Sequence, residues 1–492
     1  NIKRYIMNKI SCFLPYAGKE QVEKTVNSLQ ATGLIEEIRL ITTDATLESL
    51  PDCEILFVDM PYSSATLKAI ANAAKGEYTL LYTKETTLEM GMFALERMIH
   101  ILEDSSAGMV YADHYQIADG KQSNAPVIDY QFGSLRDDFN FGSLLLFNTE
   151  KLKEAAGHMK SDYNFAGLYD LRLKLSQHSD LVHINEYLYS EVENDTRKSG
   201  EKIFDYVDPK NRDRQIEMEQ ACTEHLKEIG GYLAPEFKKI EFSAGNFEYE
   251  ASVIIPVRNR IRTIRDAIKS VLMQKTDFKY NLIIIDNHST DGTTEAIDEF
   301  KDDERVIHII PERTDLGIGG CWNMGVHHPK CGKFAVQLDS DDVYKDENTL
   351  AIMVRAFYEQ NCAMVVGTYM MTDFNMNMIA PGIIDHKEWT PANGRNNALR
   401  INGLGAPRAF YTPVLREVKV PNTSYGEDYA LGLNFSRQYQ IGRVYDVVYL
   451  CRRWDDNSDA SLDIVKMNGH NLYKDRIRTW ELQARIAMNK NK

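Results

Sequence analysis

The chain lacks the cysteine pairs that a disulfide framework or a structural zinc site would need. Its seven cysteines are scattered, and no two of them form a Cys-x-x-Cys pair, a pattern that suits a reducing compartment. No apolar run approaches the ~20 residues of a membrane span, and residues 1–9 are too short and polar a stretch for a signal peptide. We therefore expect a cytoplasmic protein without a transmembrane segment, which can still lie against the inner face of the membrane.

Basic residues are scarce relative to acidic ones. The 492 residues include 57 Lys and Arg against 72 Asp and Glu, a formal net charge of −15. This balance argues against nucleic acid as a partner, and an anionic substrate would need local cations or a metal. Since domains hold roughly 100 to 200 residues, two large domains are the simplest division, while the subunit number stays open, a homo-oligomer included.

Strands and helices alternate in the second half of the chain. Apolar β-formers occupy 251–256, 281–286, 306–310 and 334–338, and apolar residues recur at helical spacing between 264 and 272. This alternation predicts an α/β fold with a mostly parallel sheet.

The first half repeats the same plan. Residues 332–342 match 76–86 at an offset of 256 positions, 428–436 match 168–176 at 260, and 410–412 match 147–149 at 263. Such slow drift predicts a duplicated domain. We expect tandem domains at 1–204 and 249–492, the latter with a C-terminal helix, joined by a linking helix within 205–248 that stops at Gly230-Gly231.

An acidic cluster ends the apolar run 334–338. Asp339, Asp341 and Asp342 follow it directly, and ligands of open α/β sheets bind at the carboxyl ends of strands. Hard cations are held there by one or two carboxylates together with substrate phosphates, so the cluster predicts Mn²⁺ or Mg²⁺ and a nucleotide-linked donor. The alternative is an aspartate-rich loop that caps the next helix.

The first copy does not keep these acids. Thr83, Glu85 and Thr86 take their places, with Lys84 between them, and Gly167-Leu168 replaces Glu427-Asp428. We therefore predict that the N-terminal copy is inactive.

The second copy resembles a family 2 glycosyltransferase with the GT-A fold. The residues that carry the resemblance occur in the family's order over roughly 250–460: Val253-Ile-Ile-Pro256, Asp286 with Ser289 and Asp291-Gly292, Asn323-Met-Gly325, Leu338-Asp-Ser-Asp-Asp342 and Gly426-Glu427-Asp428. The first copy matches mainly in layout, so the resemblance implies two tandem GT-A-like domains of which one is degenerate.

The resemblance assigns a nucleotide site. Pro256 and Arg258 would cradle the nucleotide, and Asp286, in the turn with Ser289 and Asp291, would accept from the uracil imide; the alternative for Asp286 is a strand-end turn residue. Asn323 would open a helix near the diphosphate.

The resemblance also assigns metal and catalytic residues. Asp339 would contact the ribose, Asp341 would be the leading metal ligand and Asp342 a second candidate. Asp428, preceded by Glu427, would be the base that takes the acceptor proton, unless the two acids only cap a helix.

Two positions depart from the family pattern. Trp322 stands where many relatives have an arginine, and no histidine occurs at the expected late metal position. Arg452 and Arg453 could instead neutralise the diphosphate.

The acceptor side is harder to predict. Gly405 and Arg408 lie in a tight glycine-containing loop that could meet a sugar or an anionic carrier, and Trp389 could stack on a sugar ring, although tryptophan is more often a core residue.

The sequence therefore predicts a metal-dependent, inverting hexosyltransferase that uses a UDP-sugar. Its acceptor would be a saccharide or a lipid-linked molecule in cell-surface or capsular polysaccharide synthesis. Two alternatives stay open: a non-catalytic sugar- or nucleotide-binding scaffold, and a sugar-phosphate nucleotidyltransferase. The latter favours a glycine-rich phosphate loop, which 257–260 lacks.

Overall fold

The computed structural model describes residues 9–193, 212–454 and 462–492. The chain divides into two compact units. Over the described residues, the N-terminal unit comprises 9–193, 212–230 and 463–475, and the C-terminal unit comprises 231–454, 462 and 476–492. The proposed domains 1–204 and 249–492 each contain one complete sheet.

The N-terminal unit alternates strands and helices. Its elements are β1 (Ile10–Pro15), α1 (Lys19–Gln30), β2 (Ile35–Thr42), β3 (Glu54–Phe57), α2 (Ser64–Ala73), β4 (Tyr78–Tyr82), β5 (Thr87–Met90), α3 (Ala94–Asp104), β6 (Met109–Ala118), β7 (Lys121–Ala125), β8 (Leu144–Asn148), α4 (Thr149–His158), α5 (Gly167–Ser176), β9 (Leu181–Val192) and α6 (Arg212–Ile229).

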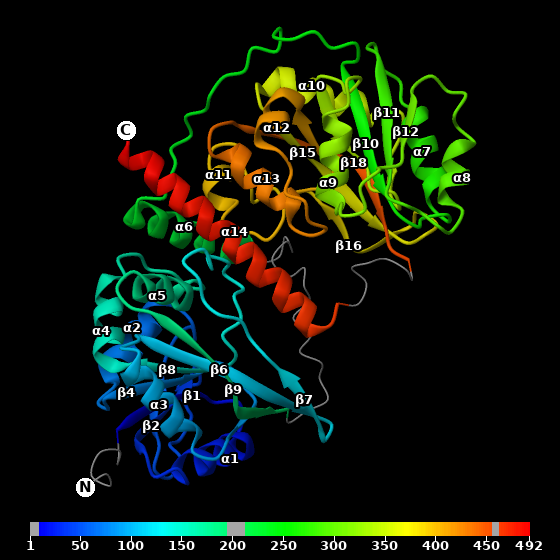
Figure 1. The fold of residues 1–492 in the computed structure, drawn as a ribbon. Helices are drawn as coiled ribbons and strands as arrows, with labels where there is room; N and C mark the ends of the chain where they lie inside the picture. Colours follow the sequence, from blue (N-terminus) through cyan, green and yellow to red (C-terminus); the bar gives the residue numbers. More distant parts are fainter. Residues whose placement is uncertain (1–8, 194–211, 455–461) are drawn as a thin grey trace. The chain divides into compact units, whose positions relative to one another are not determined.

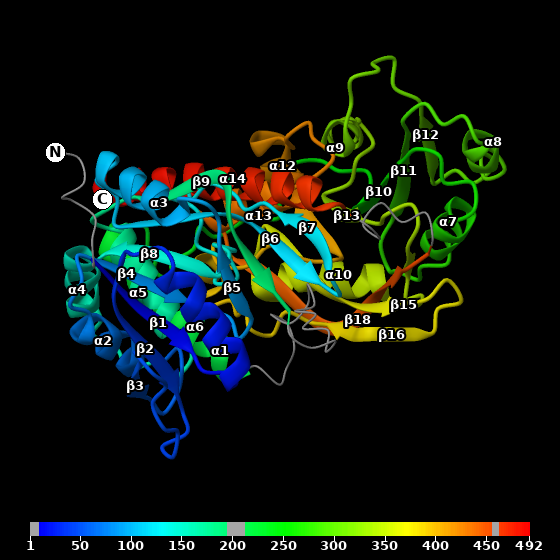
Figure 2. The same cartoon turned by 90° about the horizontal axis from the view of Figure 1, so that it is seen from below.

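The two faces of this sheet bury two separate apolar clusters. Because neighbouring side chains in a strand point to opposite faces, Cys12 and Leu14 pack in one cluster with α1 and α3, and Phe13 packs in the other with α2, α4 and α5. The unit is therefore a helix–sheet–helix sandwich, and Figure 2 shows β1, β2 and β3 side by side within it.

The C-terminal unit follows the same plan. Its elements are β10 (Ala251–Val257), α7 (Ile264–Leu272), β11 (Tyr280–Asp286), α8 (Thr293–Asp298), β12 (Val306–Ile309), α9 (Ile318–Val326), β13 (Phe334–Gln337), β14 (Val343–Tyr344), α10 (Thr349–Gln360), β15 (Met364–Thr372), β16 (Met378–Ile384), α11 (Gly394–Asn397), β17 (Arg408–Tyr411), α12 (Thr412–Val418), α13 (Glu427–Ser436) and β18 (Ile441–Arg452), with the latter part of α14 (Ile464–Lys490). Figure 1 shows β10, β11 and β12 side by side.

The two sheets have the same strand order. The first runs β3-β2-β1-β4-β8-β6-β9-β5 and the second β12-β11-β10-β13-β17-β15-β18-β14, with β7 and β16 as matching extra strands. In each described sheet, six of nine strands run in one direction, as the parallel and antiparallel pairings require. The predicted architecture of two tandem α/β domains with mostly parallel central sheets is confirmed.

The segment expected to link the domains divides between them. Residues 205–211 lie outside the described residues. Helix α6 packs in the N-terminal unit, where Glu224 and Glu228 lie 3.1 and 2.8 Å from Lys174 Nζ. It ends at Ile229, and the next residue, Gly230, has a φ of 80°, a backbone conformation that glycine adopts readily. Residues 231–248 belong to the C-terminal unit, so α6 is part of a domain rather than a free linking helix.

The predicted C-terminal helix is α14. Its first part packs in the N-terminal unit, where Asp475 accepts from the Ser134 hydroxyl at 2.8 Å, and its second part packs in the C-terminal unit. Among residues 9–193, 212–454 and 462–492, no helix combines the length and apolar character needed to cross a membrane.

Candidate active site

The candidate site lies at the carboxyl edge of the C-terminal sheet. Strands β10 and β11 end together because Val257 pairs with Asp286, and β13 ends at Gln337 alongside them. The acidic turn 339–342 follows Gln337 directly. This is the edge at which parallel α/β sheets bind ligands.

Asp339 is the exposed member of the acidic cluster. Its Oδ1 accepts from Nε2 of the buried Gln337 at 2.9 Å, and its backbone N–H donates to the Tyr449 hydroxyl at 3.2 Å. Although water reaches the carboxylate, protein surrounds it closely, and this desolvation together with repulsion from Asp341 raises its pKa. Asp339 is thus a fixed carboxylate that a donor can contact.

Asp342 is buried and held on both sides. Its Oδ2 accepts from the Tyr449 hydroxyl at 2.7 Å and its Oδ1 from the backbone N–H of Arg452 at 2.8 Å. Burial, and then repulsion from Asp341 and Asp339, raises its pKa well above the ordinary value. Because both oxygens are engaged in the interior, the structure makes Asp342 a support for the turn and does not favour its predicted role as a second metal ligand.

Asp341 is half-buried and lies beside Trp454. The indole N–H of Trp454 is directed at Asp341 Oδ2 across 3.4 Å, a long contact. Of the two predicted metal ligands, Asp341 is therefore the one whose carboxylate can turn toward a ligand.

The residues present fit a divalent cation that shares its coordination with the substrate. Within the described parts of the chain, no group of three or more His, Cys, Asp or Glu side chains could hold a metal alone. Hard cations often need only one or two carboxylates when phosphates and water complete the shell. Repulsion from Asp341 contributes to the raised pKa values of Asp339 and Asp342. A bound cation would offset this repulsion.

Arg452 braces the acidic turn instead of facing the donor. Its side chain is 1 % exposed; Nε donates to the carbonyl oxygen of Asp341 at 2.8 Å, and Nη1 lies 2.9 Å from Asp266 Oδ2 on α7. The predicted contact between Arg452 and phosphate is not supported. Arg453 is half-buried, and its phosphate contact stays a prediction.

Asp428 and Glu427 open helix α13. Asp428 Oδ2 lies 2.9 Å from Nη1 of Arg408, whose side chain is 14 % exposed, and Asp428 itself is 27 % exposed. Arg408 is also electrostatically coupled to Asp339 and Glu427. The sheet thus brings together acids that are far apart in the chain around one guanidinium group.

Glu427 is a weaker acid than an ordinary glutamate. Burial, and then the charge of Asp428, raises its pKa to about 7. Capping alone does not call for a pair of adjacent acids with this unfavourable interaction, since one carboxylate complements a helix N-terminus.

Asp286 closes a turn instead of facing a ligand. It is fully buried; Oδ2 accepts from the Thr294 hydroxyl at 2.6 Å and lies 3.1 Å from His308 Nε2, and Oδ1 accepts from the Ser289 N–H at 3.1 Å. Burial alone would raise its pKa, but these hydrogen bonds together lower it. The predicted contact with uracil is not supported, and the alternative of a strand-end turn residue fits the geometry.

Ser289 and Asp291 join this turn to the loop after β10. The Ser289 hydroxyl accepts from the Asn259 N–H at 3.0 Å, and Asp291 Oδ2 accepts from the Ile261 N–H at 3.2 Å. Both residues therefore fix the loop that follows Pro256, rather than presenting free side chains.

The loop after β10 carries three arginines, two of which lie near Trp454 beside the acidic turn. Arg258 is exposed, and the guanidinium groups of Arg260 and Arg262 lie 5.9 and 5.2 Å from the Trp454 ring centroid. The Thr263 hydroxyl donates to the Ser340 carbonyl at 3.0 Å, which ties this loop to the acidic cluster. The site therefore holds local positive charge despite the negative net charge.

Asn323 does not open a helix. Helix α9 begins at Ile318, so Asn323 lies in its second half, where Nδ2 donates to the Val420 carbonyl at 2.7 Å and Oδ1 accepts from the Val420 N–H at 2.9 Å. The prediction that Asn323 lies at a helix start near the diphosphate is wrong, because the helix begins at the preceding glycine-rich segment.

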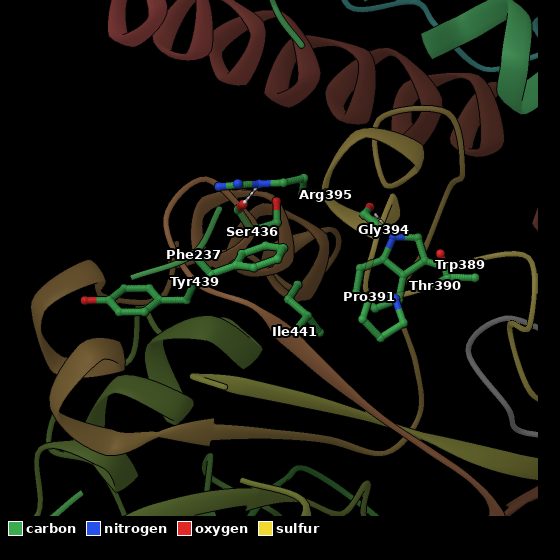
Figure 3. A pocket seen from close by; sticks show the side chains of 9 residues that line it. All are labelled: Phe237, Trp389, Thr390, Pro391, Gly394, Arg395, Ser436, Tyr439 and Ile441. Carbon is green, nitrogen blue, oxygen red and sulfur yellow. Dashed lines mark hydrogen bonds between the residues drawn. The ribbon is translucent and has the colours of Figure 1, made fainter. Parts of the chain in front are cut away.

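Trp389 lies in the interior of the segment 385–400. Its side chain is 1 % exposed, its indole N–H donates to the Gly394 carbonyl, and Arg443 lies 5.0 Å over its ring. The ring lines a small pocket together with Phe237, as Figure 3 shows. The predicted sugar-stacking platform is not supported, since this ring is enclosed by protein.

The equivalent edge of the N-terminal unit has a different chemistry. Thr83 stands in place of Asp339, and Leu168 in place of Asp428. Lys84 Nζ lies 3.0 Å from the buried Glu191, which also accepts from the Ser143 hydroxyl. Where the C-terminal unit has carboxylates that could hold a cation, the N-terminal unit thus has an ion pair between Lys84 and Glu191.

Sequence reasoning missed Gln337 and Tyr449. Gln337 is a polar residue in an otherwise apolar strand, which is a detectable signal, and its side chain bonds Asp339. Tyr449 gives no comparable signal, because tyrosine is common in strands, yet its hydroxyl joins Asp339 to Asp342.

Comparison with known proteins identifies a family and several relatives that this chain resembles. Residues 252–409 match the model of the family named Glycosyl transferase family 2. An uncharacterized glycosyltransferase of Rickettsia felis is 37% identical over 198 residues, which cover 40% of this chain and 31% of the relative. The GalNAc(5)-diNAcBac-PP-undecaprenol beta-1,3-glucosyltransferase of Campylobacter jejuni is 36% identical over 93 residues, 18% of this chain and 29% of the relative. The chain thus spans less than a third of the length of these two relatives.

A solved structure also resembles part of the chain. The crystal structure of S. aureus TarS 1-349 in complex with UDP-GlcNAc aligns with a TM-score of 0.39 and 16% identity, covering 49% of this chain and 72% of TarS 1-349.

Proposed function

We propose that this chain, whose residues 252–409 match the model of the family named Glycosyl transferase family 2, moves a hexose from a UDP-sugar to a saccharide or lipid-linked acceptor. The proposed reaction is a metal-dependent, inverting transfer that contributes to a cell-surface or capsular polysaccharide. The match to this family supports a glycosyltransferase activity, and the donor, acceptor and stereochemistry are further parts of the proposal.

One observation carries the proposal. The donor-side acid Asp339 and the acceptor-side acid Asp428 are distant in sequence, yet both interact with Arg408. The acidic cluster can hold a donor, and Asp428 beside it can take a proton. A protein that only binds sugar or nucleotide has no need for the second group.

The donor diphosphate would lie between the acidic turn and the loop after β10. Arg258, Arg260 and Arg262 supply positive charge there, and guanidinium groups suit phosphate oxygens. Asp341, together with the diphosphate, would hold a Mn²⁺ or Mg²⁺ ion, which when bound offsets the negative charge that develops on the departing UDP. Asp339 would accept from a ribose hydroxyl.

Asp428 would act as the base. The acceptor hydroxyl gives its proton to Asp428 while its oxygen bonds to the anomeric carbon. The bond from that carbon to the phosphate oxygen breaks, and UDP leaves with the electron pair. A single in-line displacement of this kind inverts the anomeric carbon, and Glu427, with a pKa of about 7, is the second candidate for the proton.

Two further points concern the acceptor and the N-terminal unit. The Campylobacter jejuni relative is named for an undecaprenol-linked acceptor, which supports a lipid-linked acceptor here. The N-terminal unit is proposed to be non-catalytic, because Thr83 replaces Asp339 and Leu168 replaces Asp428, the two acids that the proposed reaction requires.

The test is donor binding and turnover. UDP with Mn²⁺ should raise the Tm of the wild-type chain by about 5–10 °C at concentrations near 100 Kd. A panel of UDP-glucose, UDP-galactose, UDP-GlcNAc and UDP-GalNAc, assayed for UDP release, should identify one preferred donor. No Tm shift and no UDP release from any donor would contradict the proposal.

A further inference from the structure

The guanidinium group of Arg408 lies at the centre of the candidate site. Nη1 donates to the Leu404 carbonyl at 2.8 Å and lies 2.9 Å from Asp428 Oδ2. A carboxylate that is 27 % exposed at the start of a helix would otherwise sample several rotamers. Nη1 fixes one of its oxygens, and the backbone N–H of Tyr429 donates to the other at 2.8 Å.

The backbone of Arg408 is itself tied to the donor side. Its N–H donates to Gln337 Oε1 at 3.0 Å, and Gln337 Nε2 donates to Asp339 Oδ1 at 2.9 Å. One buried amide therefore sets the position of Asp339 and of the strand that carries Arg408. The hydrogen-bonded series Asp339, Gln337, Arg408 and Asp428, which we call the 339–428 relay, runs from the donor carboxylates to the proposed base.

Gly405 makes the close packing of this arginine feasible. Its φ is 114°, and a Cβ at this position would lie 2.8 Å from Cγ of Arg408. A glycine is therefore needed both for the backbone conformation and for the space that the arginine occupies.

The N-terminal copy shows that the fold does not need the relay. By the strand register and the repeat offsets, Leu81 corresponds to Gln337, Leu145 to Arg408 and Leu168 to Asp428. The same strand order forms in that unit with leucine at all three positions. Burying polar and charged side chains costs free energy, and leucine could fill the same positions without that cost. The polar residues of the C-terminal unit are therefore expected to serve a purpose other than folding.

We propose that Arg408 is a positioning residue for catalysis, which holds the Asp428 carboxylate in register with the donor-side carboxylates through Gln337. This inference rests on the proposed glycosyltransferase function. The role differs from that of an acceptor-binding arginine, because Arg408 acts through Asp428.

The test is a double-mutant cycle on the full chain, with UDP release from the preferred donor of the panel as the readout. Arg408→Leu, which copies Leu145, should lower kcat by about 10²-fold while the donor KM changes less than about threefold. Arg408→Lys keeps the charge and should recover part of kcat. In the Asp428→Asn background, Arg408→Leu should cost less than about threefold more, because the base it positions is already lost.

A matched control separates this role from a structural one. Arg416→Leu removes another half-buried arginine of the same unit, whose Nε donates to the Val326 carbonyl at 2.8 Å. It should lower the Tm and leave kcat unchanged. Gln337→Leu, which copies Leu81, should lower kcat in the same direction as Arg408→Leu.

Three outcomes would overturn the inference while leaving the proposed function intact: wild-type kcat in Arg408→Leu, a donor KM that rises in parallel with the loss, or losses that simply add in the double variant. Failure of the wild-type chain to release UDP from any donor would instead refute the proposed function, and the inference with it.

Discussion

Glu427 should make the stability of the chain depend on pH. Its pKa rises from the ordinary value of 4.5 to about 7 in the folded state, because burial and the neighbouring Asp428 disfavour the charged form. The folded protein therefore binds a proton more tightly than the unfolded chain. Stability from this source is complete below pH 4.5 and is lost as the pH rises through about 7.

The size of the effect follows from the shift. At 1.36 kcal/mol per unit, a change from 4.5 to about 7 is worth about 3 kcal/mol. Glu427→Gln keeps the shape of the protonated acid and removes the titration. The variant should therefore gain about 3 kcal/mol on the wild type between pH 4.5 and 8, which is about 6–12 °C in Tm for a unit of this size.

The assay is thermal unfolding of the full chain without nucleotide or metal, at half-unit steps of pH. Glu295→Gln is the matched control, because Glu295 is exposed on α8 and should give a flat difference from the wild type. A flat difference for Glu427→Gln as well would refute the reasoning, since it would mean that Glu427 has the same pKa in the folded protein and in the unfolded chain.

Three other predictions concern the candidate site, and a fourth concerns its counterpart in the N-terminal copy. Asp341→Asn should abolish the Mn²⁺-dependent Tm shift with UDP, and an unchanged shift would exclude Asp341 as a metal ligand. Asp428→Asn should keep that shift and lower UDP release by about 10²-fold or more; equal kcat in variant and wild type would exclude it as the base. Gly405→Ala should displace the Arg408 side chain and lower kcat with a normal donor KM, whereas a wild-type kcat would show that the relay tolerates movement of Arg408. Glu85→Gln in the N-terminal copy should leave UDP release within about twofold of wild type, and a large loss would mean that this copy takes part in the reaction.

The sequence predicts those features of the fold that depend on local pattern. Apolar runs such as 251–256 and 281–286 become buried strands because few other elements can bury every side chain of so short a run. The repeat offsets predict the duplication because equal spacing of motifs requires equal numbers of strands and helices between them. The matching order of the two sheets is the outcome.

The site is less predictable because partners come from distant strands. From the sequence alone, Asp286 is predicted to offer its carboxylate to a ligand. In the structure, His308 of the neighbouring strand and Thr294 of the next helix both contact its Oδ2. Arg452 is predicted as a phosphate ligand from its position alone, but Asp266 and the Asp341 carbonyl take its guanidinium group. Both residues satisfy buried groups of the protein itself, a role that depends on the packed fold.

The two copies together distinguish residues that build this fold from residues that serve chemistry. Both sheets form with the same order, so a polar group that one copy replaces by an apolar one is not required for folding. By this criterion folding does not require Gln337, Arg408 or Asp428, since Leu81, Leu145 and Leu168 replace them. This fits the roles in the reaction that we propose for them. Asp428 introduced alone in place of its leucine would not restore a site in the N-terminal unit, because no arginine would stand beside it and no amide would fix that arginine. Under the proposed mechanism, activity requires the whole relay, whereas the sheet requires only that the same positions be filled.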